Sequence, residues 1–245
     1  MNDNPVLLLV HNCLELTKRC VESIRNQDIP TYLLVIDNAS TDGTFNWLKD
    51  NHIHTVRNER NEGVSAGWNW GFDTLFEAGH NWVLSPNNDT ILAPNTYRRL
   101  LEYNVPFVTG ISTGDMAQIG PNAIHEDNTL VSGPDFSLFL LRREAWNKIG
   151  KFDTSMRLYA GDNDFHIRAH RAGVRLLRAN VPFYHERSST LRNANPKERR
   201  IIEMQADADR MEFYRKYGFH CGHLNTLRSL TRDSSEWMLN ESTIQ

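Results

Sequence analysis

The residues with the clearest chemical potential lie in a polar turn at 85–90. Asp89 sits in this turn, directly after the apolar run at 82–84. An apolar run that ends in a polar turn is typical of a buried parallel strand whose carboxyl end opens onto a ligand crevice. A carboxylate there suits Mn²⁺ or Mg²⁺, and such an ion could carry the phosphates of a nucleotide. The alternative is a plain surface turn, because Asn and Asp dominate turns in general.

A second carboxylate occupies an equivalent position earlier in the chain. Asp37 follows the apolar run at 32–36 and precedes a stretch at 38–44 that combines Asx-turn residues, a helix N-cap and a glycine. A carboxylate at the end of a buried strand can accept hydrogen bonds from an N–H group of a base or from ribose hydroxyls. The alternative is that Asp37 only caps its own turn.

Small residues gather where a helix is predicted to start, within residues 61–71. Gly63, Ser65 and Gly67 would let a ligand approach the backbone, and the amino end of a helix favours an anion. The segment contains neither of the two common glycine-rich phosphate signatures. We interpret the apolar stripe that follows, which includes Trp68 and Phe72, as core packing.

The elements that must position these residues alternate between strand and helix. Apolar runs predict strands at 6–10, 32–36, 53–56, 82–84, 136–141 and 174–178. Between the first two strands, Leu14, Thr17, Val21 and Ile24 form the inner stripe of a surface helix. This order predicts an α/β fold with a mainly parallel sheet, right-handed crossovers and flanking helices.

The C-terminal part of the chain predicts one more helix. Asn195, Pro196 and Glu198 have the spacing of a helix start, and Gly218 is placed to end it. A stripe at helical spacing comprises Ile201, Met204, Ala208, Met211 and Tyr214. Arg and Lys outnumber Asp and Glu across 187–232, which describes either a solvated face or a surface for an anionic partner.

Composition limits the possible classes of protein. With 245 residues, 40% of them hydrophobic and 23% charged, the chain can bury one substantial core. The longest apolar runs are too short to cross a bilayer and the first residues do not resemble a signal peptide, so we expect a cytoplasmic protein. The three cysteines are expected to be reduced, and the net charge of -3 argues against a general polyanion binder.

Taken in order, the motifs of the first half resemble the nucleotide-sugar-binding half of family-2 glycosyltransferases with the glycosyltransferase-A fold. In that family the acid after the second strand contacts the base, and a DXD turn holds the metal and the diphosphate. The first acid of the turn is Asn87 here, so the metal grip would rest mainly on Asp89. The resemblance implies donor-nucleotide contacts at Val10, His11, Asn12, Asp37, Asn61, Gly63, Gly67, Asn69, Asn87 and Asn88.

Two segments of the second half extend this resemblance. Residues 149–153 and 158–173 are similar to the Gly-Gly-Phe-Asp and Glu-Asp-x-Asp segments of the family, and the second of these carries the general base. Its first acid is Gly161 here, which leaves Asp162 as the base and Asp164 as the neighbour that holds the geometry. The alternative, that both acids cap a helix, is compatible with this role. A histidine can complete the metal shell in related enzymes, which implies His185 as a second ligand.

These observations predict a single glycosyltransferase-A domain at 1–190, followed by a helical extension at 191–245. The nucleotide-binding half would cover about 1–92 and the acceptor half about 93–190. The resemblance implies a metal-dependent, inverting transfer of a sugar from a nucleoside diphosphate sugar to an acceptor hydroxyl. The acceptor could be a saccharide or a lipid-linked or protein glycan.

Three alternatives remain open at this stage. The acceptor could be a hydroxymethylated base in DNA, with the basic C-terminal region as the contact surface. The chain could be a degenerate module that binds nucleotide sugars without turnover, which the loss of an acid at Asn87 and at Gly161 would favour. Nucleotidyl transfer would require a basic glycine-rich loop near the N-terminus, and residues 10–13 do not supply one.

Overall fold

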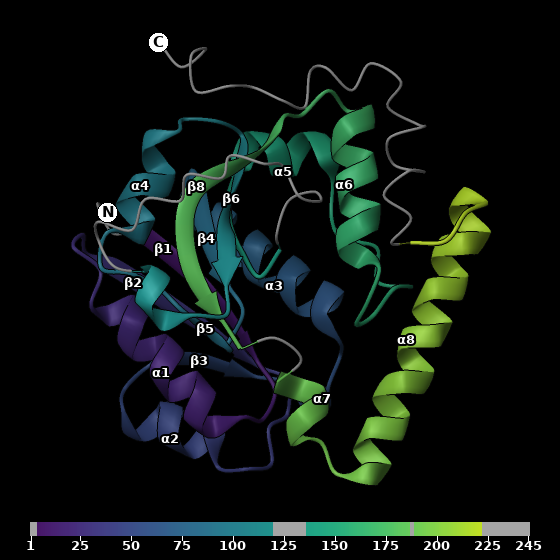
Figure 1. Cartoon of the computed structure of the whole chain (residues 1–245), viewed down its shortest axis with the longest axis horizontal. Coiled ribbons are helices and arrows are strands. Elements are labelled where there is room, and N and C mark those ends of the chain that lie inside the picture. The colour runs from purple at the N-terminus through teal and green to yellow at the C-terminus, as the bar shows by residue number, and fades with distance from the viewer. Residues whose placement is uncertain (1–3, 120–135, 187–188, 222–245) are drawn as a thin grey trace.

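The computed structural model describes residues 4–119, 136–186 and 189–221, and these form an α/β fold around one curled sheet (Figure 1). The strands lie in the order β3-β2-β1-β4-β7-β6-β8-β5. Their bounds are β1 Asn4–Val10, β2 Thr31–Asp37, β3 His54–Arg57, β4 Trp82–Pro86, β5 Thr90–Ile91, β6 Phe107–Thr113, β7 Leu138–Arg142 and β8 Leu176–His185.

The two halves of the sheet differ in strand direction. β1 pairs in parallel with β2 and β4, and β2 pairs in parallel with β3, which confirms the predicted opening of the fold. β7 runs antiparallel to both β4 and β6, whereas β6 and β8 are parallel and β5 returns antiparallel to β8. The predicted mainly parallel sheet is confirmed. The carboxyl ends of the parallel strands β1 to β4 lie at one edge of the sheet, where the loops that follow them can meet.

Helices cover both faces of the sheet. α1 Leu14–Arg25, α2 Thr44–Asp50 and α4 Thr96–Glu102 contribute to the core on one face, with β1 and β8. α3 Val64–Glu77, α5 Arg143–Ile149 and α6 Gly161–Arg171 cover the other face. The remaining helices are a 3₁₀ turn at Met116–Ile119, α7 Ser189–Asn193 and α8 Pro196–Tyr217, which stands beside α6 in Figure 1.

The core on the α3 side is built largely from aromatic rings. Trp68 and Phe72 of α3 are buried, which confirms that their stripe packs in the core. The rings of Phe152 and Phe165 stack with their centroids 4.2 Å apart, and the ring of Trp68 packs on Phe152 at 4.8 Å. Stacked and tilted rings at these distances contribute more than their buried area alone. This cluster therefore fixes both ends of the segment between α5 and α6.

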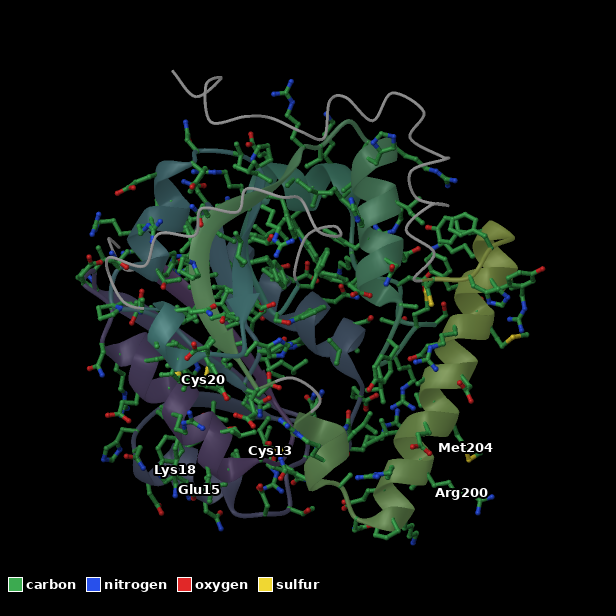
Figure 2. All side chains as sticks on the ribbon, viewed as in Figure 1. Cys13, Glu15, Lys18, Cys20, Arg200 and Met204 are labelled. Atoms are coloured by element: carbon green, nitrogen blue, oxygen red, sulfur yellow. The ribbon has the colours of Figure 1, made fainter. Side chains whose placement is uncertain are left out.

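α8 has the predicted ends but turns a different face inward. The Asn195 side chain accepts from two backbone N–H groups and forms a capping box with Glu198, and Gly218 ends the helix at φ 77°. The inner face holds Ala206, Asp209 and Phe213. The apolar stripe noted in the sequence is exposed, and Met204, for example, retains 64% of its accessible surface. Met204 and Arg200 project away from the molecule in Figure 2.

Two further expectations concern the membrane and the cysteines. Within the described ranges, no helix combines the length and the apolar character needed to cross a bilayer. Cys13, Cys20 and Cys221 are all free thiols, as their odd number and spacing predicted.

Candidate active site

A cleft of about 2070 Å³ opens where the loops after β1, β2 and β4 meet the segment before α6, the end of β8 and α8. The position agrees with the rule that open α/β sheets bind ligands beyond the carboxyl ends of their strands. The predicted site residues that line this cleft are Val10, His11, Asn12, Asn61, Asn87, Asn88, Asp89, Asp162 and His185.

Asparagine side chains join the three loops at the floor of the cleft. The backbone N–H of Asn12 donates to Ser40 Oγ at 2.8 Å, and Asn12 Oδ1 accepts from the backbone N–H of Thr41 at 2.8 Å. Asn88 Nδ2 donates to Thr17 Oγ1 at 3.1 Å and to the carbonyl of Asn12 at 3.4 Å. Asn12 has φ 57°, a left-handed conformation that Asn tolerates better than most residues. The floor is therefore a cross-linked polar surface.

His11 and Asn38 form the next part of the floor. His11 Nδ1 lies 2.7 Å from the carbonyl oxygen of Asn38, so this nitrogen carries the proton and Nε2 is left as an acceptor. The Asn38 side chain donates to the carbonyl of Gly63 at 3.1 Å and accepts from Asn58 Nδ2 at 2.7 Å. Asn38 lines the cleft, and the sequence analysis passed over it because the neighbouring carboxylate was the stronger signal.

Asp37 lies beneath this floor and does not line the cleft. Its side chain is fully buried and accepts from the backbone N–H of Ser40 at 3.0 Å. Its other carboxylate oxygen lies 3.5 Å from Arg57 Nε. In this structure Asp37 thus shapes the turn after β2, which is the alternative that the sequence analysis left open.

The two predicted metal ligands lie together. Asp89 Oδ1 is 3.3 Å from His185 Nε2, and their side chains are 10% and 16% exposed. The pairing of β5 with β8 brings them together, because Thr90 is opposite His185 and the carbonyl of Asp89 accepts from the backbone N–H of Glu186 at 2.9 Å. A carboxylate and an imidazole are both suitable ligands for Mn²⁺.

Asp162 lies in the first turn of α6 and lines the cleft. Its Oδ1 accepts from the backbone N–H of Asn163 at 2.8 Å and from Asn163 Nδ2 at 2.9 Å. A carboxylate in the first turn also interacts favourably with the helix dipole. The side chain therefore has a defined orientation at the start of the helix and faces the space where a ligand can bind.

Asp164, two residues later, belongs to the interior instead. It is fully buried, accepts from Arg168 Nε at 2.8 Å and from Tyr217 Oη at 2.7 Å, and pairs with Lys216 Nζ at 2.6 Å. Burial raises the pKa of Tyr217, and its hydrogen bond to Asp164 raises it further. Partial burial alone would raise the pKa of Asp153, but hydrogen bonds from Lys216 and Ser155 lower it to about 2. Asp164 can hold geometry but does not reach the cleft.

Close backbone packing joins the donor-side loop to the segment before α6. The carbonyl of Arg157 accepts from the backbone N–H groups of Val64 at 2.6 Å and Ser65 at 3.3 Å, and Ser65 Oγ donates to the carbonyl of Met156 at 2.7 Å. A Cβ on Gly161 would lie 2.8 Å from Ser65 Oγ. This contact gives a packing reason for a glycine where the family pattern has an acid.

We expect Gly63→Ala to destabilise the protein and to lower its activity. Gly63 has φ +90°, and an added Cβ would lie 2.7 Å from the carbonyl oxygen of Arg157. Backbone strain and overlap together should lower the free energy of unfolding by about 2–4 kcal/mol. Urea denaturation measures this change. Gly114→Ala is the matched control because a Cβ there meets no atom within 4 Å, and equal stability of the two variants would contradict the packing argument.

Two other predicted donor residues serve packing in this structure. The Asn69 side chain makes two hydrogen bonds to the backbone of Phe152. Its Nδ2 donates to the carbonyl at 2.8 Å, and its Oδ1 accepts from the N–H group at 2.7 Å. A Cβ on Gly67 would lie 2.4 Å from Leu9 Cδ1, so this glycine permits close contact between α3 and β1. Neither residue lines the cleft, nor does Gly63. The types of these residues predicted a close or polar contact, but they did not predict that the contact would be with the interior of the protein.

Several residues that line the cleft carry no clear signal in the sequence. Arg192 lines the cleft and forms an ion pair with Glu186 at 2.9 Å. The apparent extension contributes Glu198, Ile202 and Gln205 of α8 to the wall. Their only sequence signal was membership of a helix, because nothing in the local pattern indicates that α8 folds back beside the cleft. Other lining residues that were not predicted are Arg19, Arg157, Tyr159 and Arg178.

Comparison with protein families finds a match in the first part of the chain. Residues 6–106 match the family model described as Glycosyl transferase family 2, a range that contains β1 to β5 and the loops of the cleft floor. The fold of the described residues is that of glycosyltransferase-A enzymes. The predicted resemblance to family-2 glycosyltransferases is confirmed for this part of the chain.

Solved structures share this fold at low sequence identity. Residues 1–349 of S. aureus TarS with UDP-GlcNAc have 17% identity and a TM-score of 0.58, over 96% of this chain and 78% of that chain. Mycobacterium tuberculosis glucosyl-3-phosphoglycerate synthase with Mn²⁺, UDP and glucosyl-3-phosphoglycerate has 14% identity and a TM-score of 0.58, over 90% and 81%. The mannosyltransferase PcManGT of Pyrobaculum calidifontis with GDP-Man and Mn²⁺ has 16% identity and a TM-score of 0.52, over 95% and 79%.

One of the similar structures is much longer than this chain. The chain spans 47% of the length of the longer TarS structure, at 15% identity and a TM-score of 0.59. A sequence search among curated proteins finds no match. The comparisons thus show the fold and the resemblance of residues 6–106 to family-2 glycosyltransferases.

Proposed function

We propose that this enzyme transfers a sugar from a nucleoside diphosphate sugar to an acceptor hydroxyl, with a divalent metal ion and with inversion at the anomeric carbon. The observation that carries the proposal is that Asp89, His185 and Asp162 come from three separate segments and line the same cleft. This combination provides ligands for a cation that binds a diphosphate, and a carboxylate for an acceptor.

The donor nucleotide would lie on the cross-linked floor of the cleft. His11 and Asn12 present an imidazole and an amide group there, and Asn61 and Asn87 also line the cleft. These groups can hydrogen-bond a base and a ribose without adding charge. Asp37 would act from below by fixing the turn that carries Asn38. The TarS, PcManGT and synthase structures are complexes with UDP-GlcNAc, GDP-Man and UDP, so a nucleotide-linked donor fits the fold.

Asp89 and His185 would hold Mn²⁺ or Mg²⁺. The described residues contain no group of three or more His, Cys, Asp or Glu arranged for a metal ion, so the protein offers these two ligands and the donor would offer phosphate oxygens. Such ions are commonly bound by one or two carboxylates together with substrate phosphates. When bound, the ion neutralises charge on the leaving diphosphate. Two of the three structures named above contain Mn²⁺.

Asp162 would act as the general base. It takes the proton of the acceptor hydroxyl as the acceptor oxygen bonds to the anomeric carbon, while the bond from that carbon to the diphosphate oxygen breaks. The diphosphate leaves with the bonding electron pair. A single displacement of this kind inverts the configuration of the anomeric carbon. Asp164 would act as a positioning residue, because its buried ion pairs with Arg168 and Lys216 fix α6.

Four basic residues of the C-terminal region are paired with acids, so these four give no particular support to a DNA acceptor. On α8, Arg210 pairs with Asp207, Arg215 pairs with Glu212, and Lys216 pairs with Asp153 and Asp164. Arg192 pairs with Glu186. A nucleic-acid surface needs cations that are available to phosphates, whereas each of these four residues is paired with an acid. We therefore propose a saccharide, lipid-linked or protein-linked glycan hydroxyl as the acceptor.

A screen for donor turnover tests this proposal. The purified chain is incubated with sugars linked to UDP, GDP, TDP or CDP, and release of the nucleoside diphosphate is measured with Mn²⁺, with Mg²⁺ and with EDTA. We expect metal-dependent release from one nucleotide class, slow with water alone and faster with an acceptor. Tight nucleotide binding without any release would instead identify the degenerate module that Asn87 and Gly161 suggested.

A further inference from the structure

We infer that Asp209 of α8 is a positioning residue for the general base, so that α8 is part of the catalytic apparatus and not an appendage. The inference rests on the proposed role of Asp162. It concerns the backbone segment at 157–159, which lies between the donor-side loop and the start of α6.

Asp209 satisfies three successive backbone N–H groups. Its Oδ1 accepts from Arg157 at 3.0 Å, and its Oδ2 accepts from Leu158 at 2.7 Å and from Tyr159 at 2.9 Å. Gln205 Nε2, one turn earlier on α8, donates to Oδ1 at 2.7 Å. Asp209 is fully buried. A buried carboxylate is tolerated only when such donors replace water, and an irregular backbone segment needs acceptors for its N–H groups.

The clamped segment leads directly to Asp162. Ala160 follows at φ 61°, a left-handed conformation that is unfavourable for a residue with a side chain, and α6 begins at Gly161. Such strain persists where the surroundings over-determine the backbone. The opposite side of the segment is held by α3, whose N–H groups of Val64 and Ser65 bond the carbonyl of Arg157. Asp209 therefore completes a clamp that fixes the entry into α6.

A second attachment of α8 acts further along the same region. Lys216 Nζ lies 2.6 Å from a carboxylate oxygen of Asp153 and 2.6 Å from one of Asp164, and Tyr217 Oη donates to Asp164 at 2.7 Å. α8 therefore contacts this part of the chain at Asp153, at residues 157–159 and at Asp164, on both sides of Asp162. A displacement of about 1 Å in a catalytic group can lower a rate about 100-fold, so the clamp should influence turnover more than donor binding.

The test compares Asp209→Asn with Asp207→Asn on the same helix. Asn places an N–H₂ group against backbone donors, whereas Asp207 is 77% exposed and pairs only with Arg210 on its own helix in the described structure. We measure kcat and KM for transfer, the Kd for nucleoside diphosphate, and hydrogen exchange of peptides that cover 156–162. We expect Asp209→Asn to accelerate this exchange at least tenfold and to lower kcat about 10–100-fold, with Kd within twofold of the wild type. Asp207→Asn should change none of these quantities.

Asp209→Glu keeps the experiment informative if the Asn variant does not fold. It retains the charge and shifts the carboxylate by one methylene, and we expect an intermediate loss of kcat with an unchanged Kd. Unchanged exchange at 156–162 in a folded variant, or faster exchange with unchanged kcat, would overturn the inference. A wild-type chain without any transfer would instead refute the proposed function, and the exchange data would still decide whether Asp209 holds the segment.

Discussion

Replacement of Asp162 by Asn will lower kcat for sugar transfer by about 10²–10⁴-fold and leave the Kd for the nucleoside diphosphate within twofold. The amide has nearly the same shape and can still accept from the backbone N–H of Asn163, so the start of α6 should survive. It cannot take a proton from an acceptor hydroxyl. Steady-state kinetics of both proteins, with isothermal titration of the nucleotide, separates loss of the base from loss of binding.

An exposed carboxylate provides the matched control for this prediction. Asp50 lies outside the cleft, so Asp50→Asn should keep the wild-type kcat. A folded Asp162→Asn variant with wild-type kcat would remove Asp162 from the mechanism, and the base would have to be sought among the other acids of the cleft.

Replacement of Asp89 by Ala will lower kcat/KM by about 10²–10⁴-fold, because a metal ion at a leaving diphosphate contributes several kcal/mol to transition-state stabilisation. His185→Ala should have a smaller effect of the same kind, since its Nε2 lies 3.3 Å from Asp89 Oδ1 and offers the second ligand. Turnover measured against Mn²⁺ concentration should show that both variants require more metal for half-maximal rate.

A histidine elsewhere on the sheet supplies the control for metal dependence. His54 begins β3 and does not line the cleft, so His54→Ala should keep the wild-type response to Mn²⁺. If Asp89→Ala retained both the rate and the metal response of the wild type, the metal site would not lie at the junction of β5 and β8.

The sequence predicted the strands and the cleft floor well because the relevant signals are local. An apolar run followed by a polar turn locates Asp89 at a strand end, and the wall of the cleft forms there. The capping residues around Asn195 predicted the start of α8 for the same reason. Strand β6 and the short β5 carried no comparable signal, and only the pairing of β5 with β8 shows why His185 lies beside Asp89.

Side-chain direction and distant contacts were beyond such reasoning. Asn69 has the type of a ligand-binding residue, yet it grips the backbone of Phe152, which is far away in sequence. The sequence shows an apolar stripe on α8, but the helix turns Asp209 inward, where three backbone N–H groups require an acceptor. A hydropathy pattern cannot show that buried backbone N–H groups need an acceptor. Buried polar partners of this kind appear only when the chain is folded.

Isothermal titration of UDP, GDP, TDP and CDP, each with Mn²⁺, with Mg²⁺ and with EDTA, tests the central claim most directly. The account predicts that one nucleoside diphosphate binds to the wild type when a divalent ion is present, that EDTA weakens this binding, and that Asp89→Ala weakens it similarly. Absence of binding for every nucleotide under every condition would contradict the donor site built around the cleft floor, Asp89 and His185.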